Sequence, residues 1–191
     1  NSGVINLGTL AVDGTVKLTT NGTGSATVVN DAGLNFAAST VGGNLVATAT
    51  TDNITQNRAL IIIGTSYFTT SANDARITLD NRKNVFSGKV TLSTTGSSAY
   101  ADIDGGTTAL NIGASSVGGN LYIRSGNALG ITDSGTVTVG GNLAATTDAN
   151  SGVINLGTLA VDGTVQLTTN GSGNATVVND AGLTFAASTV G

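Results

Sequence analysis

The hydrophobic residues of this chain occur in short runs of alternating apolar and polar positions, and a turn containing glycine separates each run from the next. Alternation with a period of two predicts β-strands. The turn has a constant form, in which an apolar residue and a pair centred on glycine precede a new alternation. Six clear copies start at Val12, Val41, Phe86, Val117, Val139 and Val161, and a weaker copy starts at Ile63.

The spacing of these turns reveals a repeat at two levels. Four of the six intervals between successive copies are about 22 residues long, and the other two are longer by about eight. Residues 150–191 repeat residues 1–42, with identity at 38 of 42 positions, so the long period is 149 positions. The spacings also divide it into two similar half-units, at about 12–85 and 86–160. We therefore expect residues 1–191 to be one continuous segment of a longer tandem array, beginning and ending inside a unit.

The short step divides into three strands, for example residues 121–124, 129–132 and 136–139. Strands this short must stack on equivalent strands of neighbouring repeats, in parallel and about 4.8 Å apart. The pattern predicts an all-β fold, a parallel β-helix (β-solenoid) with about 22 residues per coil. The longer spacings leave two alternatives open, because a half-unit could hold three coils with wider turns or four smaller coils.

Glycine and asparagine mark the corners of this predicted coil. A sharp change of direction requires backbone angles that glycine, asparagine and aspartate adopt at low cost. We assign a structural role to the corner residues Gly14, Gly43, Gly88, Gly119, Gly141, Gly163, Asn44, Asn120 and Asn142. Because the three asparagines occupy the same place in their motifs, we expect them to align between coils as a ladder of side-chain amides.

The composition favours a slim β core and excludes several kinds of active site. The chain has 28 Gly but no Pro, His, Cys or Glu. Without His, Cys and Glu it has no His-based triad, no thiol chemistry and none of the usual zinc sites. The segment 102–106 (Asp-Ile-Asp-Gly-Gly) resembles a calcium-binding turn, but it occurs once, so a plain Asp-Gly turn is favoured. We predict no catalytic residue, no cofactor, no metal site and no enzymatic function.

Charge is low and unevenly distributed. Seven basic and eleven acidic residues argue against nucleic acid or anionic membrane as a partner. No apolar run is long enough to span a bilayer. Residues 58–89, however, hold five basic and two acidic residues. The favoured interpretation is a solvated region whose ion pairs contribute little. The alternative is a contact patch for anionic glycans, formed by Arg58, Arg76, Arg82, Lys83 and Lys89.

The chain contains the blocks VGGNL…ITDSGTVTVGGNL and NVFSGKVTLS…ALNIGASSVGGNL. Through this combination it closely resembles the tandem repeats of filamentous haemagglutinin-like large exoproteins of Gram-negative bacteria, and the resemblance covers essentially the whole chain. The resemblance implies a right-handed β-helical filament exported by two-partner secretion through an outer-membrane transporter, with this segment as shaft. The chain departs from the pattern at residues 63–67, where the corner glycine has shifted.

We therefore expect a structural shaft of a secreted fibre at the cell surface of a Gram-negative bacterium, which mediates adhesion to host cells, surfaces or other bacteria. Its partners would be further copies of the repeat, the secretion transporter, and host or environmental glycans or surfaces. The alternative is a non-adhesive extracellular filament or matrix polymer assembled by stacking of repeats. A glycan-active enzyme that uses Asp80 is the least favoured interpretation.

Overall fold

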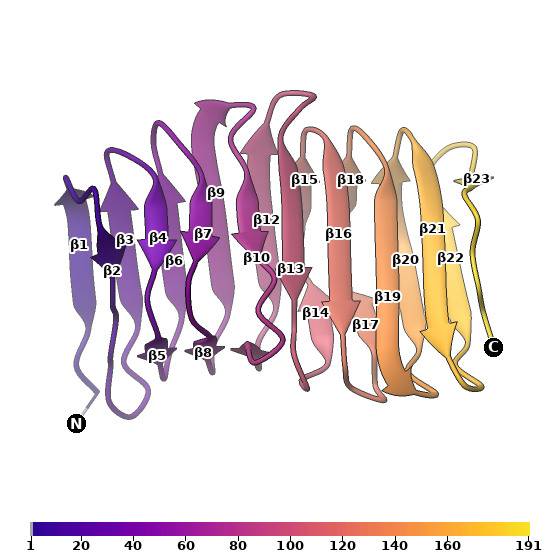
Figure 1. The fold of residues 1–191 in the computed structure, drawn as a ribbon, viewed down its shortest axis with the longest axis horizontal. Helices are drawn as coiled ribbons and strands as arrows, with labels where there is room; N and C mark the ends of the chain where they lie inside the picture. The colour runs from indigo at the N-terminus through magenta and orange to yellow at the C-terminus, as the bar shows by residue number, and fades with distance from the viewer. Residues whose placement is uncertain (1) are drawn as a thin grey trace.

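The computed structural model describes residues 2–191, which wind into a solenoid of about nine coils with about 21 residues per coil and no helix. The coils stack through parallel strands, so the predicted parallel β-solenoid is confirmed. In Figure 1 the front strands run downward and the rear strands upward while the chain advances from left to right, which makes the coil right-handed. A search of the described residues for a helix long and apolar enough to cross a membrane finds none.

Three sheets run along the solenoid (Figure 1). Sheet A, at the rear, has 11 strands: β1 (Ile5–Leu10), β3 (Ala26–Asn30), β6 (Leu45–Ala49), β9 (Ser66–Asn73), β12 (Val90–Thr95), β14 (Leu110–Ile112), β15 (Ser115–Val117), β17 (Ile131–Asp133), β18 (Val137–Val139), β20 (Ile154–Val161) and β22 (Ala175–Asn179). Sheet B, at the front, has nine strands: β2 (Thr15–Val16), β4 (Leu34–Phe36), β7 (Ile54–Gln56), β10 (Ile77–Leu79), β13 (Tyr100–Asp104), β16 (Asn120–Ser125), β19 (Leu143–Asn150), β21 (Thr164–Asn170) and β23 (Thr184–Phe185). Sheet C has three: β5 (Ser39–Val41), β8 (Leu60–Ile62) and β11 (Val85–Phe86).

We number the coils 1 to 9, beginning at β1, β3, β6, β9, β12, β14, β17, β20 and β22. Within each coil the chain passes from sheet A to sheet B over the A-to-B edge, at the top of Figure 1, and returns over the opposite return edge. In coils 2 to 4 the return edge carries sheet C. The register joins residues one coil apart in the sequence, as in the pairs Ala26–Leu45 and Ser66–Val90.

The core is a narrow column filled by the inward side chain of every second strand residue. Most of these are Val, Leu, Ile and Ala, and most are fully buried. Three phenylalanines widen the column where sheet C is present. Phe36, Phe68 and Phe86 meet edge to face, with ring centroids 6.4 and 6.1 Å apart, a geometry that aromatic pairs favour.

The two half-units are offset by half a coil, which neither sequence-based alternative anticipated. The first VGGNL motif turns the chain from sheet C into sheet A at Leu45, whereas the second turns it from sheet A into sheet B at Leu121. Each of the two longer spacings thus spans one and a half coils. A half-unit therefore holds three and a half coils, so the long period of 149 positions spans about seven. The pairing of coils 1 and 2 (Ile5 with Ala26) recurs in coils 8 and 9 (Ile154 with Ala175).

Two local details differ from the sequence-based expectation. Of the three strands expected in residues 121–139, the middle one begins at Ile131, because Gly130 has a φ of 67° and Leu129 is 71% exposed in the turn. At residues 63–67 the shifted glycine keeps its place in the stack. A Cβ on Gly64 would overlap the backbone of Gly43, and one on Gly88 would overlap that of Gly64.

Candidate functional site

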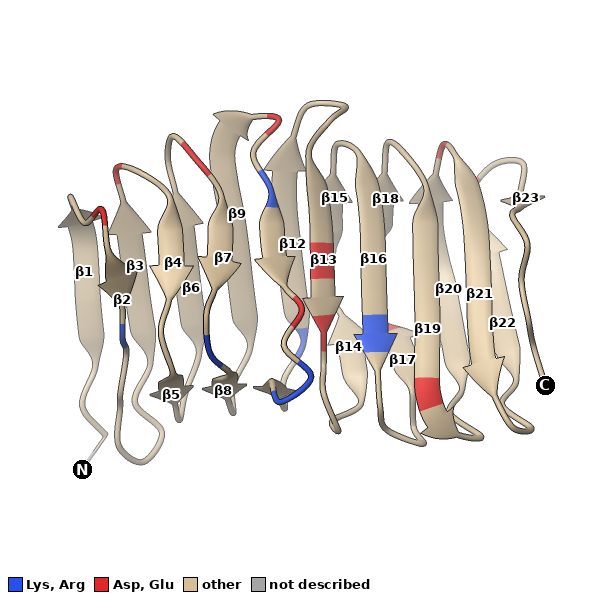
Figure 2. Cartoon of the chain, viewed as in Figure 1, with Lys and Arg blue, Asp and Glu red and all other residues tan. Residues whose placement is uncertain are grey.

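The five basic residues of the sequence-predicted patch do not form one surface. Arg58, Arg82 and Lys83 lie on the return edge of neighbouring coils, after β7 and β10. Arg76 lies at the opposite end of β10, where its guanidinium carbon sits 5.0 Å from the ring centre of Tyr100. Lys89 precedes β12, at the corner between sheets C and A. All five side chains are exposed. The blue segments of Figure 2 lie at separate places along the coils and do not merge into one surface.

The outward face of sheet B carries an ionic cluster that combines coils 5 and 6. Arg124 on β16 contacts two carboxylates of β13, with Nη2 2.6 Å from Asp102 Oδ1 and Nε 3.5 Å from Asp104 Oδ2. Burial raises the pKa of Asp102 above its ordinary value, Asp80 and Asp104 add to the rise, and the Arg124 charge opposes it. Arg124 already pairs with both carboxylates. The cluster is therefore better described as a structural ion pair between coils 5 and 6 than as an open site for an anion or a cation.

Two tyrosines extend this face. The rings of Tyr100 and Tyr122 meet edge to face, 6.2 Å apart. Their hydroxyls take part in hydrogen bonds with Thr78 (3.5 Å) and Asn120 (3.2 Å) respectively. Sequence reasoning missed this cluster because its members lie about one coil apart in the sequence. That spacing was nevertheless a signal, since residues one coil apart in sequence are neighbours in space.

The calcium-like segment 102–106 forms a closed turn. The backbone N–H of Gly106 donates to Asp104 Oδ1 over 2.7 Å, and Gly106 has a φ of 59°. Within residues 2–191 no three His, Cys, Asp or Glu side chains converge as metal ligands. The hydrogen bond to Asp104 Oδ1 and the positive φ of Gly106 are the geometry of an Asp-Gly turn.

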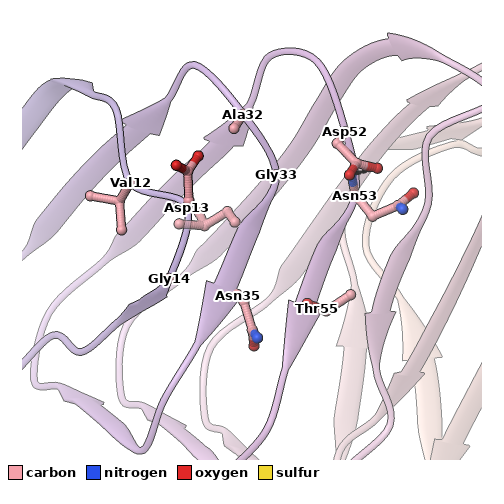
Figure 3. Close-up of a pocket in the computed structure, with 10 residues that line it drawn as sticks. Val12, Asp13, Gly14, Ala32, Gly33, Asn35, Asp52, Asn53 and Thr55 are labelled. Carbon is pink, nitrogen blue, oxygen red and sulfur yellow. Dashed lines mark hydrogen bonds between the residues drawn. The ribbon is translucent and has the colours of Figure 1, made fainter.

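A shallow hollow of about 310 Å³ opens beside the A-to-B edge of coils 1 to 3 (Figure 3). The Asp13 and Asp52 carboxylates border it, with the Asn53 side chain beside Asp52. Part of this polar lining is already used, because Asn53 Oδ1 accepts the backbone N–H of Arg76 (2.7 Å) and Asp52 Oδ1 accepts that of Asn53 (2.8 Å). The hollow can accept a few hydroxyl groups, but it does not enclose a ligand.

The corner asparagines connect coils, although not as the expected amide ladder. Asn120 Oδ1 accepts the backbone N–H of Asn142 (2.8 Å), and Asn142 Oδ1 accepts that of Thr164 (2.8 Å). Asn44 accepts in the same way from Thr65 (2.9 Å), but on the return side of the coil. The half-coil offset thus separates Asn44 from the other two. Each side chain satisfies a backbone donor of the next coil, which an amide ladder would leave unpaired.

The corner glycines follow the same division between the two sides. Gly43 and Gly88 turn the chain into sheet A, and the other four, Gly14, Gly119, Gly141 and Gly163, turn it into sheet B. At Gly119 a Cβ would overlap the backbone carbonyl of Ala99 on the preceding coil. Gly43, Gly88, Gly141 and Gly163 are packed against a neighbouring coil in the same way, whereas Gly14 in coil 1 has no atom within 4 Å of a Cβ position.

Comparison with known proteins agrees with the internal repeat. A family model described as "Repeats of unknown function (DUF5649)" matches residues 23–93 and 99–156. The starts of the two matches are as far apart in the sequence as Leu45 and Leu121. No curated protein and no solved structure matches the chain. Since the two matches cover more than half of its length, the chain belongs to the DUF5649 repeat family.

Proposed function

We propose that the chain is a stretch of the shaft of a secreted bacterial surface fibre, and that the fibre mediates adhesion to host cells, surfaces or other bacteria. The observation that carries this proposal is the continuity of the stack. Coils 8 and 9 repeat the sequence and the pairing of coils 1 and 2. Such a stack lengthens by whole periods without a change of fold.

The burial of equivalent residues supports a role that depends on extension. Leu34 and Phe36 of coil 2 are 1% and 0% exposed, because coil 3 covers them. Their copies in coil 9, Leu183 and Phe185, are 37% and 54% exposed. A coil of this kind completes its core only when another coil lies on it, so the repeat favours long stacks.

The resemblance to haemagglutinin-like exoproteins supports export through an outer-membrane transporter and a position at the cell surface. The sides of the shaft offer repetitive polar contacts. One outward row of sheet A is formed by Thr48, Thr69, Ser93, Ser116 and Thr138, on five successive coils. Contacts of this kind with glycans are weak singly but gain avidity when many act together.

Adhesion is tested by comparing the purified chain free in solution with the chain displayed densely on beads. We expect display to raise the apparent affinity for host cells or immobilised glycans by about 10²–10⁴-fold. Antibodies against the chain should label intact cells of the source bacterium. Beads that bind no better than beads carrying an unrelated protein would remove the adhesive role, and unlabelled cells would remove the surface location.

A second candidate is a non-adhesive filament or matrix polymer assembled end to end. The stacking of equivalent coils favours it, because the pairing of coils 1 and 2 recurs in coils 8 and 9. Sedimentation over a range of concentrations tests it. This assembly predicts long linear polymers that shorten when Leu183 and Phe185 are replaced by serine, and a monomeric chain at high concentration would exclude it.

A further inference from the structure

The charges of coils 1 to 4 are sorted to opposite edges of sheet B (Figure 2). An aspartate precedes each of the four sheet B strands at the A-to-B edge, namely Asp13, Asp31, Asp52 and Asp74. Basic residues follow three of these strands at the return edge, namely Lys17, Arg58, Arg82 and Lys83. We call these sets the acidic edge and the basic edge. Arg76 lies directly before β10, two residues after Asp74, and Asp80 lies directly after it, two residues before Arg82.

The two edges do not neutralise each other within the molecule. All eight side chains are exposed. The salt bridges found in residues 2–191 both belong to Arg124, which is in neither set. Asp52 and Arg58 lie six positions apart and Asp13 and Lys17 four, which are roughly 20 and 13 Å along an extended strand. Both distances exceed the screening length of about 10 Å at 0.1 M salt, so each edge is electrostatically free to attract a partner.

The spacing of the charges matches one edge to the other. Neighbouring coils lie about 4.8 Å apart, so each edge is a row of charges with that spacing or a small multiple of it. The A-to-B edge of coils 5 to 7 instead carries the uncharged residues Gly96, Gly118 and Gly140. Asp162 and Asp180 restore the acidic edge in coils 8 and 9. The acidic edge therefore recurs with the long period, whereas the copy of Lys17 in the basic edge is Gln166.

We propose that these edges pair shafts side by side, with the acidic edge of one copy against the basic edge of a second copy. Charge complementarity between two rows built on the same coil spacing identifies the occupant as another copy of this chain. A single exposed ion pair contributes only about 0–1 kcal/mol. Each edge carries four such charges, so the contributions of several ion pairs accumulate where two shafts meet.

The test is a charge exchange between the two edges. One variant, Asp13→Lys with Asp31→Lys, leaves the acidic edge with two Lys and two Asp, and a second, Arg58→Asp with Arg82→Asp, leaves the basic edge with two Asp and two Lys. Each variant thus keeps only one of the two charged edges. Within residues 2–191 the Asp13 and Asp31 carboxylates accept no hydrogen bond, so the exchange leaves the framework intact. Asp148→Lys and Lys89→Asp are matched controls, because they change charge outside the two edges. Circular dichroism verifies that each variant folds.

Self-association is measured by sedimentation velocity at low salt and at roughly tenfold higher salt. For the unmodified chain we expect the association constant to fall about tenfold or more at the higher salt. Each exchanged variant alone should lose at least about tenfold at low salt, an equimolar mixture of the two should recover, and the controls should match the unmodified chain. A mixture that stays dissociated overturns the proposal. So does association that strengthens with salt, which would indicate apolar coil ends, or association that requires calcium and is lost with a chelator.

Discussion

Buried hydroxyl groups show how closely individual residues are fitted to the coil. Ser39 is 2% exposed, and its Oγ accepts the Leu18 N–H (3.0 Å) and donates to the Ala37 carbonyl (2.9 Å). Ser66 is fully buried, yet its Oγ has no hydrogen-bond partner among the described residues. An unpaired buried hydroxyl costs free energy, whereas a paired one contributes to stability.

This contrast gives opposite predictions for the same substitution. Ser66→Ala should leave the free energy of unfolding unchanged or raise it by up to about 1 kcal/mol, and Ser39→Ala should lower it by about 1–2 kcal/mol. Urea unfolding followed by circular dichroism measures both. Equal losses at the two positions would show that the Ser66 hydroxyl has a partner.

The Asp102 carboxyl predicts a pH dependence of stability. Because burial raises its pKa in the folded chain, the folded state holds this proton more tightly than the unfolded state. Above the pKa of the folded state the carboxyl is charged, and its burial lowers the stability of the fold. As the pH falls through that pKa the carboxyl takes up a proton, and this loss of stability disappears. Relative to Asp102→Asn, the native chain should therefore gain stability as the pH falls from neutral towards the usual aspartate range. Urea unfolding at several pH values tests this, and a relative loss would contradict it.

At the level of strands and corners, the sequence predicted local structure better than it predicted position in the coil. Alternation predicted the parallel strands, and glycine predicted the corners. The half-coil offset was missed because the same motif precedes both Leu45 in sheet A and Leu121 in sheet B. Such a motif determines the shape of a corner, but the residues between motifs determine the edge on which it falls. The Arg124 cluster was missed for a similar reason, because its carboxylate partners belong to the preceding coil.

The corner glycines can be tested with two copies of one position. A Cβ on Gly163 would overlap the carbonyl oxygen of Gly141 and the side chain of Asn142, whereas a Cβ on Gly14 has no atom within 4 Å. Gly163→Ala should therefore lower the free energy of unfolding by about 2 kcal/mol or more, and Gly14→Ala should change it by less than about 0.5 kcal/mol. The urea concentrations at which the two variants are half unfolded measure these changes. Similar losses would mean that intrinsic backbone preference, and not close packing of coils, selects glycine.

For the molecule as a whole, the sequence period and the coil period differ slightly. A column of register partners starting at Thr15 passes through Asn35, Thr55, Thr78, Asp102, Tyr122 and Ala144 and reaches Gln166 after seven coils. The sequence copy of Thr15 is Thr164, so the column ends two positions beyond that copy. A lag of two positions keeps inward side chains inward, while a lag of one would turn the core outward.

This lag predicts that copies of any surface residue wind around the shaft. Two positions in a coil of about 21 residues correspond to a rotation of about 34° per period, and seven coils correspond to an advance of about 34 Å. Electron cryomicroscopy of a tandem array, labelled in each period at the exposed Asn57 after substitution by cysteine, measures both values. Labels that follow one strand column would contradict the rotation. With it, the acidic and basic edges of successive periods face different directions, so a long shaft can contact neighbours on all sides instead of forming a flat ribbon.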